Sequence, residues 1–263
     1  MQTSENPVEG VSARRLIRAL ERRLRDSLQP INGFRGVYES FKAAERAAPS
    51  LKPLGYDKAE SEHWYLPKFA GVQFGDYPIL YWLRSALAEC RTVLEIGGHM
   101  GEAFYGFASV MDYPSGLTWT VLDVPSIAAA GEAFAEKNGH TAIQFASTLE
   151  QVNGAEILLS TGALQYLETD LSTAIADFRI RPRHVLINFI PAYDGAPFVT
   201  VQNIGTAYCA YRVFNKKEFV DSLERLGYEL VASWKKPRNF KVPFYPRRSF
   251  EAYSGFYFRL RAA

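Results

Sequence analysis

The stretch Val93-Leu94-Glu95-Ile96-Gly97-Gly98-His99-Met100-Gly101 sets a buried strand directly before a glycine-rich turn, and residues 101–111 then show a helical pattern. In open α/β sheets, ligands bind at the carboxyl ends of the strands, above such a turn. Glycine lets the backbone approach a ligand closely and adopt a positive φ. The stretch therefore predicts a ligand-binding β–α turn, with an ordinary glycine-rich connection as the alternative.

The spacing of this turn indicates which ligand it suits. A dinucleotide site needs Gly-x-Gly-x-x-Gly, but counting from Gly97 the third position is His99 and the sixth is Glu102. The pattern that remains is Glu-x-Gly-x-His-x-Gly, in which the Glu95 carboxylate suits a ligand with an ammonium group. We expect a binding loop made of Glu95, Gly97, Gly98, His99 and Gly101. A nicotinamide-dependent oxidoreductase stays an alternative that this spacing disfavours.

A second acidic residue, Asp123, follows the strand predicted over 118–122. A carboxylate about 20 residues beyond the glycine turn can accept hydrogen bonds from both ribose hydroxyls. Asp123 alone is equally well explained as a helix cap, and together with the turn it favours a nucleoside ligand. Further candidate binding residues follow the neighbouring strands: Val124, Ser147, Thr161 and Gln165.

Strands and helices alternate from Arg91 to the C-terminal end. The predicted strands are 92–96, 118–122, 141–145, 155–160, 184–189, 228–234 and 255–260, and the helices are 101–111, 126–137, 171–178 and 215–226. This alternation predicts a Rossmann-like α/β fold with a seven-stranded, mostly parallel sheet, an antiparallel last strand and helices on both faces. We expect this domain over 91–263, after an N-terminal helical extension or lid over 1–90. A long connection over 190–214 interrupts the alternation.

Composition narrows the class of protein. The 263 residues include 30 Lys and Arg against 28 Asp and Glu, so nothing demands nucleic acid as a partner. Two distant cysteines, Cys90 and Cys209, suit a reducing compartment better than a disulfide framework. Without an apolar leader or an apolar run that spans a bilayer, we expect a cytoplasmic protein with no integral membrane segment. A basic amphipathic helix over 11–28 is either a solvated surface helix or a contact for an anionic membrane surface or a partner, including a second copy in a homodimer.

The chain resembles a bacterial family of class I methyltransferases that are often encoded among polysaccharide-assembly genes. The resemblance rests on segments spread over nearly the whole chain: 33–38, Ser40-Phe41, 55–57, 94–101, Asp123-Val124-Pro125, 164–167, 200–202 and Gly255-Phe256. The family usually has a small residue where His99 stands, and often Glu where Asp123 stands. The resemblance implies S-adenosylmethionine as the cofactor and O-methylation of a saccharide, nucleotide-sugar or related small molecule. A non-catalytic protein that binds this cofactor and serves a partner is the alternative from another class.

Methyl transfer to a hydroxyl group benefits from in-line positioning and from a general base. The candidates for catalysis are His99, His63 and Tyr166, whereas His140 and His184 precede strands and are expected at the opposite edge of the sheet. The long 190–214 connection is the expected acceptor site. Its candidate substrate-binding residues are Tyr193, Gln202, Asn203 and Tyr208. No set of residues indicates a metal, so we expect none.

Overall fold

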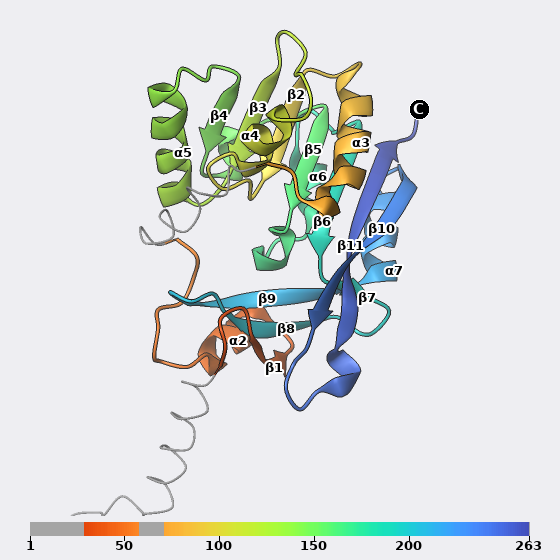
Figure 1. Ribbon diagram of the computed structural model, residues 1–263. Coiled ribbons are helices and arrows are strands. Elements are labelled where there is room, and N and C mark those ends of the chain that lie inside the picture. The colour runs from red at the N-terminus through yellow and green to blue at the C-terminus, as the bar shows by residue number, and fades with distance from the viewer. Residues whose placement is uncertain (1–28, 58–70, 263) are drawn as a thin grey trace, which may run out of the picture.

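The computed structural model describes residues 29–57 and 71–262 (Figure 1). The predicted basic helix over 11–28 and the candidate residue His63 lie outside these ranges. Within them, no helix combines the length and the apolar character that crossing a bilayer requires.

In the described part of the chain, seven strands form a large sheet in the order β4-β3-β2-β5-β6-β11-β10. Their bounds are β2 Thr92–Ile96, β3 Thr118–Leu122, β4 Ile143–Ala146, β5 Ile157–Thr161, β6 His184–Ile190, β10 Tyr228–Phe240 and β11 Phe250–Leu260. Strands β4, β3, β2, β5 and β6 are parallel, and β11 is antiparallel to both of its neighbours. The predicted mostly parallel sheet with an antiparallel last strand is confirmed. Strand order reverses between β2 and β5, where sheets of this kind bind ligands.

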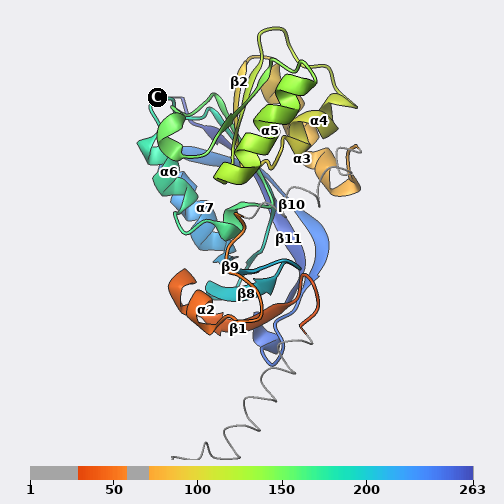
Figure 2. The ribbon, with the colours of Figure 1, turned by 90° about the vertical axis from the view of Figure 1, so that its left-hand side faces the viewer.

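Helices cover both faces of the large sheet (Figures 1 and 2). One face carries α3 (Tyr77–Leu87), α4 (Glu102–Ala108) and α5 (Pro125–Lys137), and the other carries α6 (Leu171–Asp177) and α7 (Lys216–Glu224). Apolar residues at three- and four-residue spacing, such as Ile79 and Leu83 of α3, are fully buried against the sheet. Asn215 caps the start of helix α7: its side chain accepts a hydrogen bond from the backbone N–H of Glu218 at 2.8 Å.

A small sheet accounts for most of the segment 190–214, where the sequence predicted a long connection. In the described residues its order is β1-β8-β9-β7, from β1 (Phe34–Tyr38), β7 (Ala192–Tyr193), β8 (Phe198–Asn203) and β9 (Tyr208–Asn215). Helix α2 (Phe41–Ala47) packs on it through Phe41. The expectation of a plain connection was wrong because the partner strand β1 is remote: Thr200 donates a hydrogen bond to the carbonyl of Arg35, 165 residues earlier.

The segment 1–90, predicted as a helical extension, thus contributes a strand as well as helices to the described structure. Strand β1 is hydrogen bonded to β8 of the C-terminal half. A domain boundary near residue 90 stays a prediction.

The hairpin of β10 and β11 is longer than predicted and reaches from the large sheet to the small one (Figure 1). At its far end Phe240 stacks on Phe250 at 4.7 Å between ring centroids and packs on Phe34 at 4.2 Å. Pairing also shifts by one residue, because Leu230 faces Phe258 while Ala232 faces Tyr257. The extra residue, Val231, forms a β-bulge.

Candidate functional site

The glycine-rich turn joins β2 to α4 and uses the left-handed region three times: φ is 70° at Gly97, 54° at His99 and 91° at Gly101. A Cβ atom on Gly97 would lie 2.0 Å from the Cβ of Ala163, so only glycine fits there. The backbone of His99 has a conformation that glycine adopts without strain. The His99 side chain is buried.

Asp123 holds this turn against the end of β3. Its Oδ2 accepts a hydrogen bond from the His99 backbone N–H at 2.8 Å, and its Oδ1 accepts one from the Val124 N–H at 2.8 Å. Burial raises the pKa of Asp123, and these two hydrogen bonds oppose that rise. Each carboxylate oxygen can accept a further hydrogen bond. The arrangement suits a pair of hydroxyl groups on a ligand.

Glu95 is a buried carboxyl group at the end of β2. Trp119 donates a hydrogen bond to it from Nε1 at 2.8 Å. Burial, reinforced by the nearby carboxylates of Glu102 and Asp123, raises the pKa of Glu95 to about 8. A cationic group on a ligand would offset the cost of ionising Glu95.

Glu95 lines a cavity of about 110 Å³ above the turn. The lining residues are Gly71, Gln73, Asp76, Glu95, Gly97, Gly98, His99, Glu102, Ala103, Gly106, Phe107 and Thr161. Within the described part of the chain, the Thr161 Oγ1 and the nearby Gln165 Oε1 are buried with no hydrogen-bond partner. Buried polar atoms are normally paired, so these two atoms fit a site that a polar ligand completes.

Tyr166 and Gln202, predicted separately as catalytic and substrate-binding residues, meet in the structure. The Tyr166 hydroxyl donates a hydrogen bond to the Gln202 Oε1 at 2.6 Å. The Tyr166 ring also packs on Tyr211 and lies 6.1 Å from the ring of Tyr56. The turn after β5, the small sheet and the N-terminal segment therefore come together at Tyr166.

The remaining candidate residues have partners within the protein. The Ser147 hydroxyl, beyond β4, donates to the Gln151 Oε1 at 3.2 Å. The Asn203 side chain accepts a hydrogen bond from the Lys52 ammonium at 2.8 Å and donates one to the carbonyl of Gln29. The Tyr208 ring is buried in the small sheet. These contacts hold loops and strands together.

Tyr193 lies at the β7 end of the small sheet, where it stacks on Phe250 at 5.2 Å. Its hydroxyl donates a hydrogen bond to the carbonyl of Ala196 and accepts one from Arg248. The structure brings Gln202, but not Tyr193, to Tyr166.

Two groups beside the cavity, the Asp76 carboxylate and the Lys236 ammonium, were not among the candidates. Asn188, at the end of β6, donates to the Asp76 Oδ1 at 3.2 Å and accepts from the Trp234 Nε1 at 3.0 Å. The Lys236 ammonium lies 3.8 Å from the same Asp76 oxygen. The strand predicted over 228–234 ends before Lys236, and Asp76 lies in the segment 1–90, for which only a helical extension or lid was predicted.

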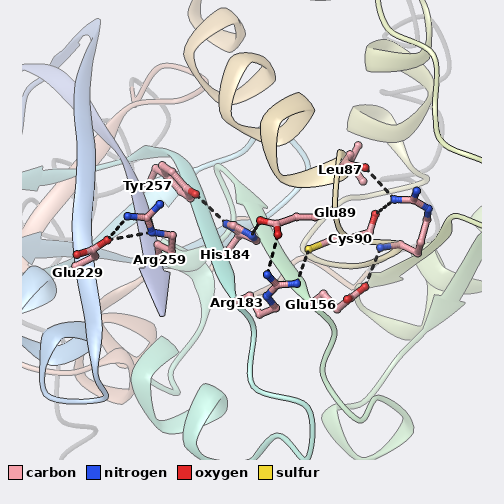
Figure 3. A network of polar contacts seen from close by, with 10 residues as sticks. Leu87, Glu89, Cys90, Glu156, Arg183, His184, Glu229, Tyr257 and Arg259 are labelled. Carbon is pink, nitrogen blue, oxygen red and sulfur yellow. Dashed lines mark hydrogen bonds and ion pairs between the residues drawn. The ribbon is translucent and has the colours of Figure 1, made fainter. Parts of the chain in front are cut away.

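His184 belongs to a polar network at the opposite edge of the sheet, as predicted (Figure 3). Its Nδ1 lies 2.8 Å from the Tyr257 hydroxyl and its Nε2 lies 3.5 Å from Glu89. Burial lowers the pKa of His184, which favours the neutral imidazole. Among the residues that the structure describes, no group of three or more His, Cys, Asp or Glu could hold a metal ion.

No family model matches this chain, and no curated protein matches it by sequence. Solved structures do resemble it. The Burkholderia thailandensis 1,6-didemethyltoxoflavin-N1-methyltransferase, solved with 1,6-didemethyltoxoflavin and S-adenosylhomocysteine, has a TM-score of 0.50 and 20% identity over 72% of this chain and 79% of its own. The magnesium protoporphyrin IX methyltransferase of Synechocystis PCC 6803, solved with S-adenosylhomocysteine, has a TM-score of 0.50 and 11% identity over 78% and 95%.

A third neighbour has another activity in the same fold. The [4+2]-cyclase SpnF matches with a TM-score of 0.50 and 11% identity over 74% of this chain and 85% of its own. The likenesses show that the chain has the Rossmann-like fold of S-adenosylmethionine-dependent methyltransferases. Since one fold supports several reactions, activity must be argued from the site.

Proposed function

We propose that this protein is an S-adenosylmethionine-dependent methyltransferase with a small-molecule acceptor. The observation that carries the proposal is the hydrogen bond from the backbone of His99 to Asp123. It fixes a carboxylate beside a left-handed glycine-rich turn, at the point where strand order reverses. That combination suits a ligand with both a ribose and a charged tail.

The chain's own groups divide the recognition of this cofactor. Asp123 would accept hydrogen bonds from the ribose hydroxyls, and Glu95 would pair with the ammonium group. Val124 and Ser147 would flank the adenine, and the buried oxygen atoms of Thr161 and Gln165 would accept hydrogen bonds from the cofactor. The bound cofactor supplies a methyl group that is already activated by its sulfonium. The protein mainly has to position the acceptor and exclude water.

The acceptor side of the site is the region of Tyr166 and Gln202. The half-buried Tyr166 hydroxyl, held by Gln202, can orient an acceptor hydroxyl, and the half-buried ring of Tyr56 near it suits a sugar face. A saccharide or nucleotide-sugar acceptor is supported by the family resemblance of the sequence. We keep Tyr166 as the candidate for catalysis over His99, because the backbone of His99 serves the cofactor turn.

Calorimetric titration with S-adenosylhomocysteine, and separately with NAD, tests the proposal. We expect micromolar binding of the first ligand only. Asp123→Ala removes two charge-assisted hydrogen bonds to the ribose, so affinity should fall by about 30-fold or more. Asp112→Ala is the matched control, because Asp112 is exposed near the end of α4. Binding of NAD instead, or equal affinity in the two variants, would contradict the proposed site.

Transfer itself is tested by incubating the protein with radiolabelled S-adenosylmethionine and a panel of sugars and sugar nucleotides. Label in a product that Tyr166→Phe makes more slowly would support the acceptor site. Cofactor binding without transfer to any acceptor would favour the non-catalytic alternative.

A further inference from the structure

Strand β10 presents a row of three large side chains toward the cavity side of the sheet. Trp234, Lys236 and Arg238 are half-buried, whereas the residues between them, Lys235 and Pro237, are exposed. This is the two-residue period of a strand. The bulge at Val231 sets the face: Leu230 packs with α7 on one side of the large sheet, and Trp234 packs with α3 on the other.

Two side chains of the row, Trp234 and Lys236, reach residues beside the cavity because glycines make room for them. A Cβ on Gly255 would lie 2.1 Å from the Trp234 Nε1, and one on Gly75 would lie 2.4 Å from the Lys236 Cε. Trp234 therefore crosses its neighbouring strand to Asn188, and the stem of Lys236 crosses Gly75 to Asp76.

A second bulge aims Phe189 at this row. Strand β6 has two residues, Asn188 and Phe189, opposite the single residue Gly255 of β11. Phe189 has a φ of 63°, a strained value for a residue other than glycine. Its ring lies against the turn after β5, 3.1 Å from where a Cβ on Gly162 would stand. Strain of this kind gathers at binding sites.

Two cations stack on the Phe189 ring. The Lys236 ammonium lies 4.4 Å from the ring centroid, and the Arg238 guanidinium carbon lies 4.7 Å from it. Arg238 also lies 5.2 Å from the ring centroid of Tyr253. Lys236 forms an ion pair with Asp76. In the described part of the chain, no carboxylate forms an ion pair with Arg238. A half-buried guanidinium held only by aromatic faces keeps its planar donors available.

We infer that the acceptor carries an oxyanion, a carboxylate or a phosphate, which Arg238 binds with help from Lys236. The inference rests on the proposed function, because it assigns this row to the acceptor of the same reaction. A guanidinium matches both oxyanions with two parallel hydrogen bonds. Asp76 joins Lys236 to the cofactor cavity, so an oxyanion on this row would bring the rest of the acceptor next to the turn after β5.

Calorimetry on the full chain saturated with S-adenosylhomocysteine tests this inference. The probes are glucose 1-phosphate, glucuronic acid and, as the neutral reference, glucose. We expect at least one anionic probe to bind more than tenfold tighter than glucose, and the stronger of the two identifies the oxyanion. Arg238→Gln should weaken that probe by about tenfold or more, the scale of a charge-assisted bidentate contact. The affinity for S-adenosylhomocysteine should stay within twofold.

Lys235→Gln is the matched control, because Lys235 is the adjacent cation on the exposed face of the same strand. It should leave every affinity unchanged, and Lys236→Gln should weaken the anionic probe less than Arg238→Gln does. Thermal unfolding of each variant shows whether it folds. If Arg238→Gln does not fold, Lys236→Gln replaces it as the test variant.

Equal affinity for glucose and both anions, no binding of either anion, or the same loss in Lys235→Gln as in Arg238→Gln would overturn the inference. A failure of S-adenosylhomocysteine to bind would instead contradict the proposed function. The anion titrations, repeated without that ligand, would then report on the row of β10 alone.

Discussion

Glu95 links cofactor binding to pH. Its pKa of about 8 means that the carboxyl group is mostly protonated near neutrality. A ligand ammonium favours the carboxylate, so binding must release this proton. We expect the affinity for S-adenosylhomocysteine to rise about tenfold per unit between about pH 6 and pH 8. Calorimetry across that range checks it, and Glu95→Gln should bind weakly with no such slope.

The same shift affects stability in the opposite direction. The folded-state pKa of Glu95 is raised above its unfolded value, so its contribution is fully present below about pH 4.5 and is lost as pH rises toward about 8. Glu95→Gln should therefore be more stable than the natural protein at pH 8, by urea unfolding. A less stable variant would mean that Glu95 is ionised in the free protein.

His99 is a residue in a glycine conformation, with φ at 54°. An L-residue in this region is strained by about 1 kcal/mol or more. His99→Gly and His99→Ala remove the same ring, but only glycine removes the strain. We expect the glycine variant to be about 1 kcal/mol more stable than the alanine variant in urea unfolding. Equal stability would show that the turn relaxes without glycine.

The residues that the sequence identified are those with a local signal. The turn from Glu95 to Gly101 and the carboxylate of Asp123 each follow a buried strand directly, and the structure joins them by the His99–Asp123 hydrogen bond. Lys236 and Arg238 carried no such signal. Two lysines next to Pro237 are typical of a loop. They lie in a strand because β10 is the edge strand of the large sheet, where proline is tolerated.

At the scale of single elements, Gly255 decides how β10 and β11 fit together. A Cβ added at this position would collide with Trp234. Gly255→Ala should therefore displace the indole from Asn188 and destabilise the protein by about 1–3 kcal/mol. Gly106→Ala in α4 is the control, because the nearest atom there is 3.7 Å away. That change should be neutral or stabilising by up to about 1 kcal/mol. Urea unfolding compares the two, and equal effects would contradict the packing described.

The strands and helices after Arg91 were predictable because each shows its own hydrophobic periodicity and is ended by residues that favour turns. Asn215 caps helix α7, which the sequence predicted over 215–226, because a cap is a local signal. The bulges at Val231 and Phe189 were not predictable, because one extra residue changes the face of a strand without changing its composition. The small sheet was missed because its strand β1 comes from far along the chain: Phe34 of β1 pairs with Gln202 of β8.

At the scale of the whole molecule, the N-terminal segment completes the small sheet. Deleting residues 1–48 would remove β1 and α2 and expose the edge of β8 together with Val199 and Val201. We expect this variant to bind a hydrophobic dye and to aggregate, as unpaired strand edges do. Deleting only residues 1–28 leaves β1 and α2 in place and is the control. A monomeric, dye-free product of the longer deletion would contradict this role.

The pairing of β1 with β8 also sets a waiting time during synthesis. Arg35 leaves the ribosome early, but its hydrogen-bond partner Thr200 is made 165 residues later. At about 5–20 residues per second, the first strand waits for roughly 10–30 s. During that interval Phe34 and Phe41 have no partner surface to cover them. The first strand therefore stays unpaired until β8 has been made.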